Sequence, residues 1–249
     1  MVGSMKLKPE VSIFAAAIRP ECWIDYYNYV GENNIPFEVI FVGPNTPRFK
    51  LPNNFRFIHS TTKPAQCFEI GRRAALGDLL INTGDDCVFA TDHPLDKLYS
   101  IYSEQANEKL IVSCRYMQNG VDRSETDHYF FCTDHSSPVM PLCMFMSRKL
   151  YDIVGGVDRN FVGVFWDLDI AMRVYAVGGT VIMSNVYCNE DKSKKGDSDL
   201  CAKFGGPDRG FLEYLWVENG KVHFNRKMPF APFFEYKLLE ETQGPRGKW

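Results

Sequence analysis

The chain has 249 residues and a formal net charge of -3, with 45% hydrophobic and 24% charged residues. That length is enough for one large domain with a sizeable core. The slightly acidic balance argues against a dedicated nucleic-acid binder, because such proteins are usually basic. The eight cysteines form no C-x-x-C pair. They indicate neither a zinc ribbon nor a thioredoxin motif, and their apolar settings predict reduced, buried thiols.

Residues 1–5 read as a remnant of expression cloning that precedes a natural start at Met5. The remaining residues, 6–249, read as a single domain, because no linker or internal repeat divides them. Neither a secretory signal nor a run of about 20 apolar residues is visible. This predicts a cytoplasmic protein without a transmembrane segment. No basic amphipathic stripe stands out, so a peripheral association with a membrane is only an open alternative.

Strands and helices alternate in the first half of the chain. Apolar runs predict strands at 11–18, 37–42, 55–58 and 79–82, and helical spacing predicts helices at 21–30 and 64–76. This order predicts an α/β fold with a mostly parallel central sheet flanked by helices. Ligands of such sheets lie beyond the carboxyl ends of the strands. Arg19, the loop 43–45 and the pair Asp85-Asp86 all follow strand ends, so we expect them to converge on one crevice.

The second half is less regular. Its patterns predict strands at 110–114, 142–146 and 181–183, helices at 148–154 and 168–177, and a mobile polar loop at 189–198. The tetrapeptide Glu218-Asn219-Gly220-Lys221 lies between the apolar runs 214–217 and 222–224. Asn-Gly between two apolar runs predicts a C-terminal β-hairpin. An aromatic extension follows and ends the chain.

The tetrapeptide Gly84-Asp85-Asp86-Cys87 is the strongest indication of function. Two adjacent carboxylates at the end of a buried strand repel each other unless a cation lies beside them. Oxygen ligands favour Mg²⁺ or Mn²⁺, and these ions usually keep positions open for substrate phosphates. The motif therefore predicts a site for a metal-bound diphosphate. A solvated turn after a strand is the alternative, since Gly-Asp-Asp also suits turns.

Four stretches, in this order, resemble the family 2 glycosyltransferases of the GT-A fold, a Rossmann-like architecture. The two most specific are residues 74–86, which end in Gly84-Asp85-Asp86, and the block from Val154-Gly155-Gly156-Val157-Asp158 to Trp166-Asp167-Leu168-Asp169 and Arg173. The other two are the first two predicted strands with the residues that end them. The similarity covers roughly residues 11–190.

The resemblance implies a hexosyltransferase-type enzyme that moves a sugar from a UDP-, GDP- or dTDP-sugar to an acceptor hydroxyl with inversion. Residues 6–105 would form the half that binds the nucleotide-sugar, 106–225 the acceptor-side half, and 226–249 a tail. The donor would contact Ala17, Arg19, Gly43, Asn45, Lys63, Gln66, Asp85 and Asp86. The acceptor would be a glycan, a lipid-linked glycan or a protein, and a homodimer is left open.

The resemblance also implies a role for each acid. Asp86 would bind Mn²⁺ or Mg²⁺ directly, and Asp85, also assigned to the metal site, would face the ribose or the donor sugar. Asp167 would be the catalytic base, although an N-cap of the following helix is the alternative role for this residue. His223 in the hairpin is a further candidate metal ligand. The alternative is a structural role, which is commoner for a lone histidine.

Some positions depart from the family pattern. Gly43-Pro44-Asn45 lacks the aspartate that usually reads the base, and Trp166 replaces an acid that often holds the acceptor. Two other functions therefore remain open: a sugar-phosphate nucleotidyltransferase, or a non-catalytic carbohydrate-binding domain. Arg72 and Arg73 are expected to form a solvated basic face, and Asp169 and Arg173 a helical ion pair.

Overall fold

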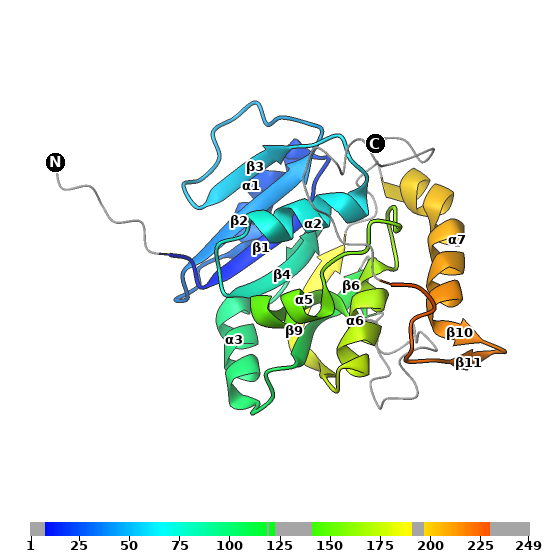
Figure 1. The fold of residues 1–249 in the computed structure, drawn as a ribbon. Helices are drawn as coiled ribbons and strands as arrows, with labels where there is room; N and C mark the ends of the chain where they lie inside the picture. The colour runs from blue at the N-terminus through cyan, green and yellow to red at the C-terminus, as the bar shows by residue number, and fades with distance from the viewer. Residues whose placement is uncertain (1–7, 119, 123–140, 191–196, 230–249) are drawn as a thin grey trace.

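A computed structural model of the chain describes residues 8–118, 120–122, 141–190 and 197–229, without the side chains at 118, 142 and 197–202. Its main feature is a mixed sheet in the order β3-β2-β1-β4-β8-β6-β9-β5, with β7 paired to β6 (Figure 1). The first four strands in this order are parallel, and so are β6 and β9. Strand β8 runs antiparallel to both of its neighbours. The predicted α/β class with a mostly parallel central sheet is confirmed.

The elements follow one another as the chain crosses the sheet. In the first half they are β1 (Val11–Ala16), α1 (Trp23–Val30), β2 (Phe37–Gly43), β3 (Phe55–His59), α2 (Pro64–Ala74), β4 (Leu79–Gly84), β5 (Cys87–Phe89) and α3 (Pro94–Glu104). In the second half they are β6 (Leu110–Gln118), β7 (Val121–Asp122), β8 (Leu142–Ser147), α5 (Arg148–Val154), α6 (Trp166–Ala176), β9 (Thr180–Glu190), α7 (Asp197–Trp216), β10 (Val217–Glu218) and β11 (Lys221–Val222). A short 3₁₀ turn, Pro20–Cys22, precedes α1.

The sheet separates two apolar cores, because successive side chains of a strand point to opposite faces. On β1, Phe14 belongs to the core that includes side chains of α2, α5, α6 and α7. Its neighbour Ile13 belongs to the other core, which includes side chains of α1 and α3. Strand β1 is buried along its whole length, which explains its continuous apolar run. The polar ends of the central strands are thus held between two packed layers.

Two helices are absent from the sequence-based prediction. Helix α3 begins with Pro94 at its first turn, a position that proline favours, and buries Leu95 and Leu98. Helix α7 runs through Gly205, Gly206 and Pro207, although these residues usually interrupt helices.

Two predicted segments need correction. Residues 214–216 are not a strand, because the helix continues to Trp216 and buries its indole in the core, and only Val217 of this run belongs to β10. The hairpin is confirmed, but its strands are only two residues each. Of the predicted mobile loop, 189–190 belong to β9 and 197–198 to α7, while 191–196 lie outside the described residues. The C-terminal extension beyond 229 lies outside them too.

Within the described ranges, no helix has the length and apolar character needed to cross a membrane.

Candidate active site

The carboxyl ends of β1, β2 and β4 lie at one edge of the sheet, since β1 is parallel to both neighbours. A hollow of about 660 Å³ opens beside the first two ends. Its lining includes Ile18 and Pro20 after β1, and Asn45, Arg48 and Phe49 after β2. The hollow thus lies at the loops that follow β1 and β2, and Arg19, Asp85 and Asp86 are not among its lining residues.

Asp85 is buried and holds the loop that follows β1. One of its carboxylate oxygens accepts hydrogen bonds from the backbone amides of Ile18 (2.8 Å) and Arg19 (2.7 Å). The other accepts from the guanidinium of Arg19, from Nε at 3.0 Å and from Nη2 at 2.6 Å. Because donors occupy both oxygens, this carboxylate does not fit the role of a direct metal ligand. It fits the role of a residue that positions the loop.

Asp86 is also buried, and its carboxylate lies 3.1 Å from Nη2 of Arg19. Its other oxygen lies back over Gly84, where an added Cβ would come within 2.6 Å of it. Arg19 therefore faces both acids. It supplies the positive charge for which the sequence argument invoked a metal ion, so repulsion between the two acids no longer requires one.

Gly43 and Ala17 approach each other so closely that only glycine fits at the end of β2. A Cβ at position 43 would lie 1.7 Å from the carbonyl oxygen of Ala17. Asn45, which is exposed, donates a hydrogen bond of 2.7 Å to the carbonyl of Ile18. These contacts fix the two loops that line the hollow. They give Gly43 and Asn45 roles in packing, and their predicted contacts with a donor stay predictions.

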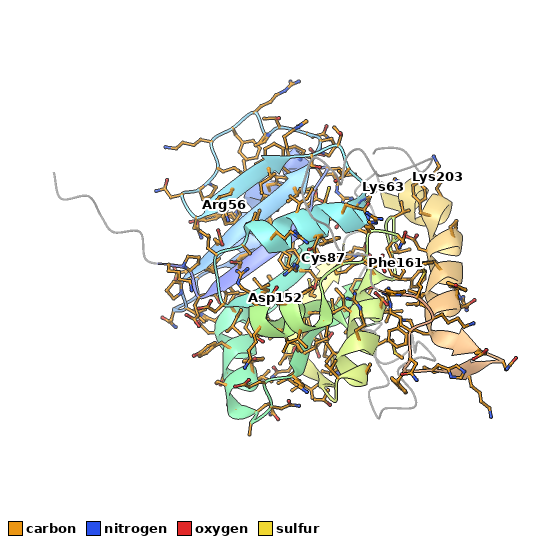
Figure 2. The ribbon with its side chains drawn as sticks, viewed as in Figure 1. Arg56, Lys63, Cys87, Asp152, Phe161 and Lys203 are labelled. Carbon is orange, nitrogen blue, oxygen red and sulfur yellow. The ribbon has the colours of Figure 1, made fainter. Side chains whose placement is uncertain are left out.

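The start of α2 connects the two halves of the chain. Lys63 is buried where this helix begins, and Figure 2 labels it together with Phe161. Gln66 donates a hydrogen bond of 2.5 Å to the carbonyl of Phe161, and the amide of Ala65 donates one of 2.9 Å to that of Val162. The loop that leads into α6 is therefore held against the helix that follows β3.

Asp167 lies in the first turn of α6, directly after this loop. Its carboxylate accepts a hydrogen bond of 2.9 Å from the amide of Leu168. Within the described part of the chain, no cationic side chain forms an ion pair with it. Loss of hydration in these surroundings raises the pKa of Asp167 to about 6, because nothing compensates the charged form fully. A carboxyl with such a pKa can take up a proton near neutral pH.

Asp208 of α7 is a residue that the sequence analysis missed. It is fully buried, and its carboxylate accepts hydrogen bonds from the amides of Val162, Gly163 and Val164 at 2.8–3.2 Å. These three amides belong to the loop that delivers Asp167. The helix that carries Asp208 contains the Gly-Gly-Pro run, so no local pattern indicates that an acid there would cap a distant loop.

We expect Asp208→Ala to lower the free energy of unfolding by about 1–3 kcal/mol, because it leaves buried loop amides without an acceptor. Urea unfolding followed by circular dichroism measures this loss. Glu213→Ala on the same helix is the matched control, since Glu213 is partly exposed and, among the described residues, its ion pair is with Arg209 at 3.0 Å. Equal stability of the two variants would contradict the assigned role of Asp208.

Two groups of buried charges hold the backbone around this loop. In α2, Glu69 is fully buried and pairs with Arg72 (2.8 Å) and Arg73 (2.7 Å). The predicted solvated face is therefore wrong for Arg72, which is buried and also pairs with Asp152 at 2.9 Å.

The second group joins α6 to the segment after the hairpin. The helical pair of Asp169 and Arg173 is confirmed at 2.9 Å. Arg226 bridges Asp169 (3.1 Å) and Asp158 (2.6 Å), and the indole of Trp216 donates to Asp169 at 2.8 Å. Asp169 is thus structural, although it stands only two residues from Asp167.

His223 is partly exposed and lies 3.5 Å from Glu218 of the same hairpin. Among the described side chains, one set of three metal-ligand types has its ligand atoms within 4.8 Å of one another, and it consists of Cys87, Cys143 and Cys188. The structure therefore does not bring His223 together with Asp85 and Asp86.

The aromatic side chain next to the predicted base, Trp166, is buried against Phe68 with a ring separation of 4.6 Å, which makes it a core residue.

No protein-family model matches the chain, and no curated protein matches it by sequence. Solved structures do match it. The mannosyltransferase PcManGT from Pyrobaculum calidifontis, in complex with GDP-Man and Mn²⁺, aligns with a TM-score of 0.62 at 16% identity over 88% of this chain and 67% of its own. Residues 1–349 of S. aureus TarS align at 0.56 with UDP bound, at 12% identity over 73% of this chain. The complex of TarS with UDP-GlcNAc also aligns at 0.56, at 14% identity.

These likenesses show the fold: the chain has the GT-A architecture of nucleotide-sugar glycosyltransferases. It spans about 60% of the length of the TarS fragment. At 12–16% identity, the comparisons do not carry the donor, the metal or the site residues of those proteins over to this chain.

Proposed function

We propose that this chain is a glycosyltransferase of the hexosyltransferase type, which transfers a sugar from a nucleoside-diphosphate sugar to an acceptor hydroxyl with inversion. The observation that carries the proposal is Asp167. On a GT-A fold, this acid stands at the start of α6 with a raised pKa and no cationic partner among the described residues. The acids nearest to it along the chain, Asp158 and Asp169, are by contrast held in ion pairs.

The hollow at the ends of β1 and β2 suits the nucleoside part of the donor. Its lining combines apolar surfaces from Ile18, Pro20 and Phe49 with the amide of Asn45 and the guanidinium of Arg48. Such a mixture of apolar walls and a few polar groups is typical of small-molecule sites. Arg19, next to Ile18 and Pro20 of this lining, pairs with both acids of the turn that follows β4. Two of the solved structures named above contain UDP-GlcNAc and GDP-Man, so we propose a donor of that class.

We propose that Asp86 holds Mn²⁺ or Mg²⁺ when the donor is bound. One carboxylate is sufficient for such an ion when water and phosphate oxygens complete its shell. Asp85 does not fit this role, since its oxygens are occupied, and Arg19 competes for Asp86 at 3.1 Å. A bound ion would neutralise charge on the diphosphate leaving group.

Asp167 accepts the proton of the acceptor hydroxyl in this proposal. As the acceptor oxygen forms its bond to the anomeric carbon, the bond from that carbon to the diphosphate breaks. The bonding pair leaves with the nucleoside diphosphate, and the hydroxyl proton moves to the carboxylate of Asp167. One base and one displacement invert the anomeric centre, and a general base typically contributes about 10²–10⁴-fold.

The rate of transfer is expected to depend on pH through Asp167. Because the pKa of Asp167 is raised to about 6, the base is protonated and inactive below that pH. The value of kcat/KM should therefore rise with pH, pass its half-maximal value near 6 and level off above about 7. Steady-state rates from pH 4.5 to 8.5 measure this, and a profile flat down to pH 4.5 would contradict the assignment.

A thermal-shift panel tests donor binding. We expect one class among UDP-, GDP- and dTDP-sugars to raise Tm, and to raise it further with Mn²⁺ than without. Arg48→Gln should weaken this shift and leave Tm without ligand unchanged, because the side chain is exposed.

The two alternative functions would give different results. A non-catalytic domain would bind carbohydrate and release no nucleotide, while a nucleotidyltransferase would release pyrophosphate from a nucleoside triphosphate and a sugar phosphate.

A further inference from the structure

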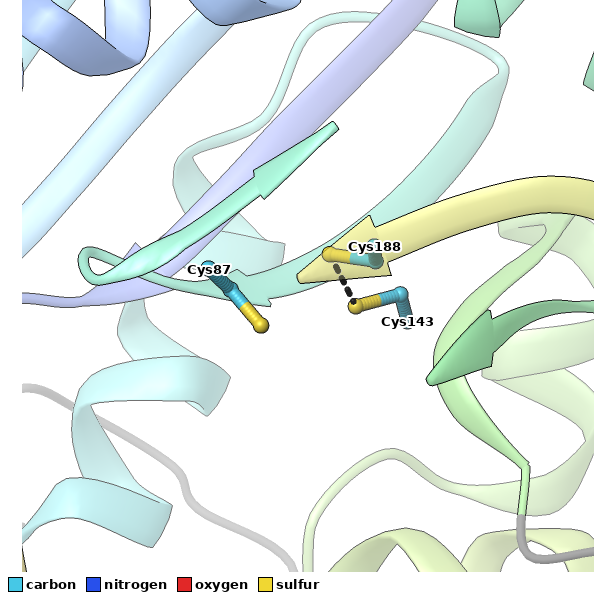
Figure 3. A group of neighbouring side chains, drawn as sticks. All are labelled: Cys87, Cys143 and Cys188. Atoms are coloured by element: carbon cyan, nitrogen blue, oxygen red, sulfur yellow. Dashed lines mark hydrogen bonds between the residues drawn. The ribbon is translucent and has the colours of Figure 1, made fainter. Parts of the chain in front are cut away.

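Three buried cysteines from three different strands meet next to the turn of Asp85 and Asp86, which joins β4 to β5. Cys87 opens β5, directly after Asp86, while Cys143 lies in β8 and Cys188 in β9 (Figure 3). Their sulfur atoms lie within 4.8 Å of one another, and the Sγ of Cys143 donates to that of Cys188 at 3.4 Å. All three side chains are at most 8% exposed. Neither the fold nor the proposed reaction accounts for such a group.

The backbone at Cys143 is held in an unusual conformation that directs its side chain. Ser113 of β6 pairs with Met144 of β8, and the next residue, Cys114, pairs with Leu142. Cys143 is therefore the extra residue of a β-bulge, and its φ of +47° lies in the left-handed region. This position usually takes glycine. Bulges of this kind commonly re-aim a side chain near a functional site, and here the thiol turns toward Cys188.

A fourth thiol, that of Cys114, lies beside Cys143 but is not among the three whose sulfurs lie within 4.8 Å of one another. Cys114 is buried, and its hydrogen bond to Cys143 is the first cause that raises the pKa of the Cys143 thiol. All four cysteines belong to one apolar core, together with residues such as Phe89, Phe145 and Val186. Sulfur ligands in an apolar site favour a soft cation, and they do not suit the oxygen-seeking Mn²⁺ and Mg²⁺ of the proposed donor site.

We propose that Cys87, Cys143 and Cys188 bind a thiophilic divalent cation, with Zn²⁺ as the first choice, and that a water molecule takes the fourth position of a tetrahedral site. Zinc–sulfur bonds of about 2.3 Å place two ligands of a tetrahedral ion about 3.8 Å apart. The sulfurs of Cys143 and Cys188 are 3.4 Å apart, and the other two separations are at most 4.8 Å, so small side-chain shifts reach that value. On binding, each ligating thiol loses its proton to solvent, and the sulfur donates a pair to the metal.

The consequence of such an ion is structural. The ion would join β5, β8 and β9 at the point where the turn of Asp85 and Asp86 leads into β5. The position of that turn depends on short pairings, since β5 has only three residues, which pair with β9. A metal there would fix the acids relative to the second half of the chain. This inference is independent of the proposed transfer reaction, because the site is made of other side chains.

The test uses the full chain, reduced with a phosphine, stripped with a chelator and titrated with Co²⁺, Cd²⁺ and Zn²⁺. We expect about one ion per chain, with the intense visible bands of tetrahedral cobalt and thiolate-to-metal charge transfer for both probes. Zn²⁺ should displace Co²⁺ and raise Tm. Because these signals arise from the unmodified chain, they test the proposal even where a substituted chain fails to fold.

Two substitutions locate the ion. Cys188→Ser and Cys87→Ser should each weaken Cd²⁺ binding by at least about 10-fold and reduce the charge-transfer intensity. Cys67→Ser is the matched control, because Cys67 is equally buried but lies in α2, in the core on the other face of the sheet. It should bind Cd²⁺ as the unchanged chain does.

Three results would overturn the proposal. The first is the absence of stoichiometric binding by the reduced chain. The second is binding that survives both substitutions, which would place the metal elsewhere. The third is cobalt spectra typical of six oxygen ligands. Formation of a Cys143–Cys188 disulfide under air, without metal binding under reduction, would show that the group is a redox pair and would also refute the metal site.

Discussion

Asp167→Asn is expected to reduce the rate of sugar transfer by about 10²–10⁴-fold, while donor affinity stays within about twofold of the original. The asparagine keeps the size of the side chain and can still accept the hydrogen bond from the amide of Leu168. It cannot take the proton of the acceptor hydroxyl. The loss should therefore appear in kcat, measured with the donor that the binding panel identifies. Calorimetric titration of the same donor measures its affinity.

Asp169→Asn provides a control on the same helix. Asp169 is fully buried and shared by Arg173, Arg226 and the indole of Trp216, so its replacement should lower the free energy of unfolding. Asp167→Asn should not lower it, since Asp167 has no such partners among the described residues. Asp167→Asn should thus lose transfer activity and keep its stability, whereas Asp169→Asn should lose stability. If Asp167→Asn transferred sugar at the original rate, this residue would not be the base.

Arg19→Met is expected to lower the free energy of unfolding by about 3–5 kcal/mol, because it leaves the buried carboxylate of Asp85 without its charged partner. Both side chains are at most 6% exposed, so water cannot replace the lost donors easily. Urea unfolding at pH 7 measures the change. The matched control is Arg48→Met, since Arg48 is an exposed arginine of the neighbouring loop, and we expect it to retain the original stability.

A double-mutant cycle separates the ion pair from other effects of these substitutions. Adding Asp85→Asn to Arg19→Met removes the unpaired charge, so the double variant should be more stable than the sum of the two single losses predicts. Additive losses would show that Arg19 and Asp85 do not act on each other. Added Mn²⁺ should not rescue Arg19→Met, because Asp85 is not a metal ligand and one of its oxygens is still occupied by the amides of Ile18 and Arg19.

The central strands could be predicted from the sequence because their burial on both faces leaves a plain signature. The apolar runs at 11–18 and 79–82 correspond to β1 and β4, and the polar residues after them lie at one edge as expected. The GT-A architecture followed from motifs that lie on these elements and on α6, and the structural comparisons confirm it.

Contacts between distant residues explain what the sequence could not predict. Arg19 and Asp85 are 66 positions apart, and no local pattern shows that a guanidinium would lie between the two acids. Asp208 caps a loop more than 40 residues away from within a helix that the Gly-Gly-Pro run concealed. The cysteine group likewise depends on how β5, β8 and β9 pair, and on a bulge that spacing does not reveal.

The most direct test of the proposed function is release of nucleoside diphosphate from UDP-, GDP- and dTDP-sugars with water as the acceptor, followed by NMR of the freed sugar. We expect slow release from one donor class in the presence of Mn²⁺ or Mg²⁺, loss of that release in Asp167→Asn, and a first-formed anomer opposite to that of the donor. No release from any donor, or a first-formed anomer identical to the donor's, would contradict it.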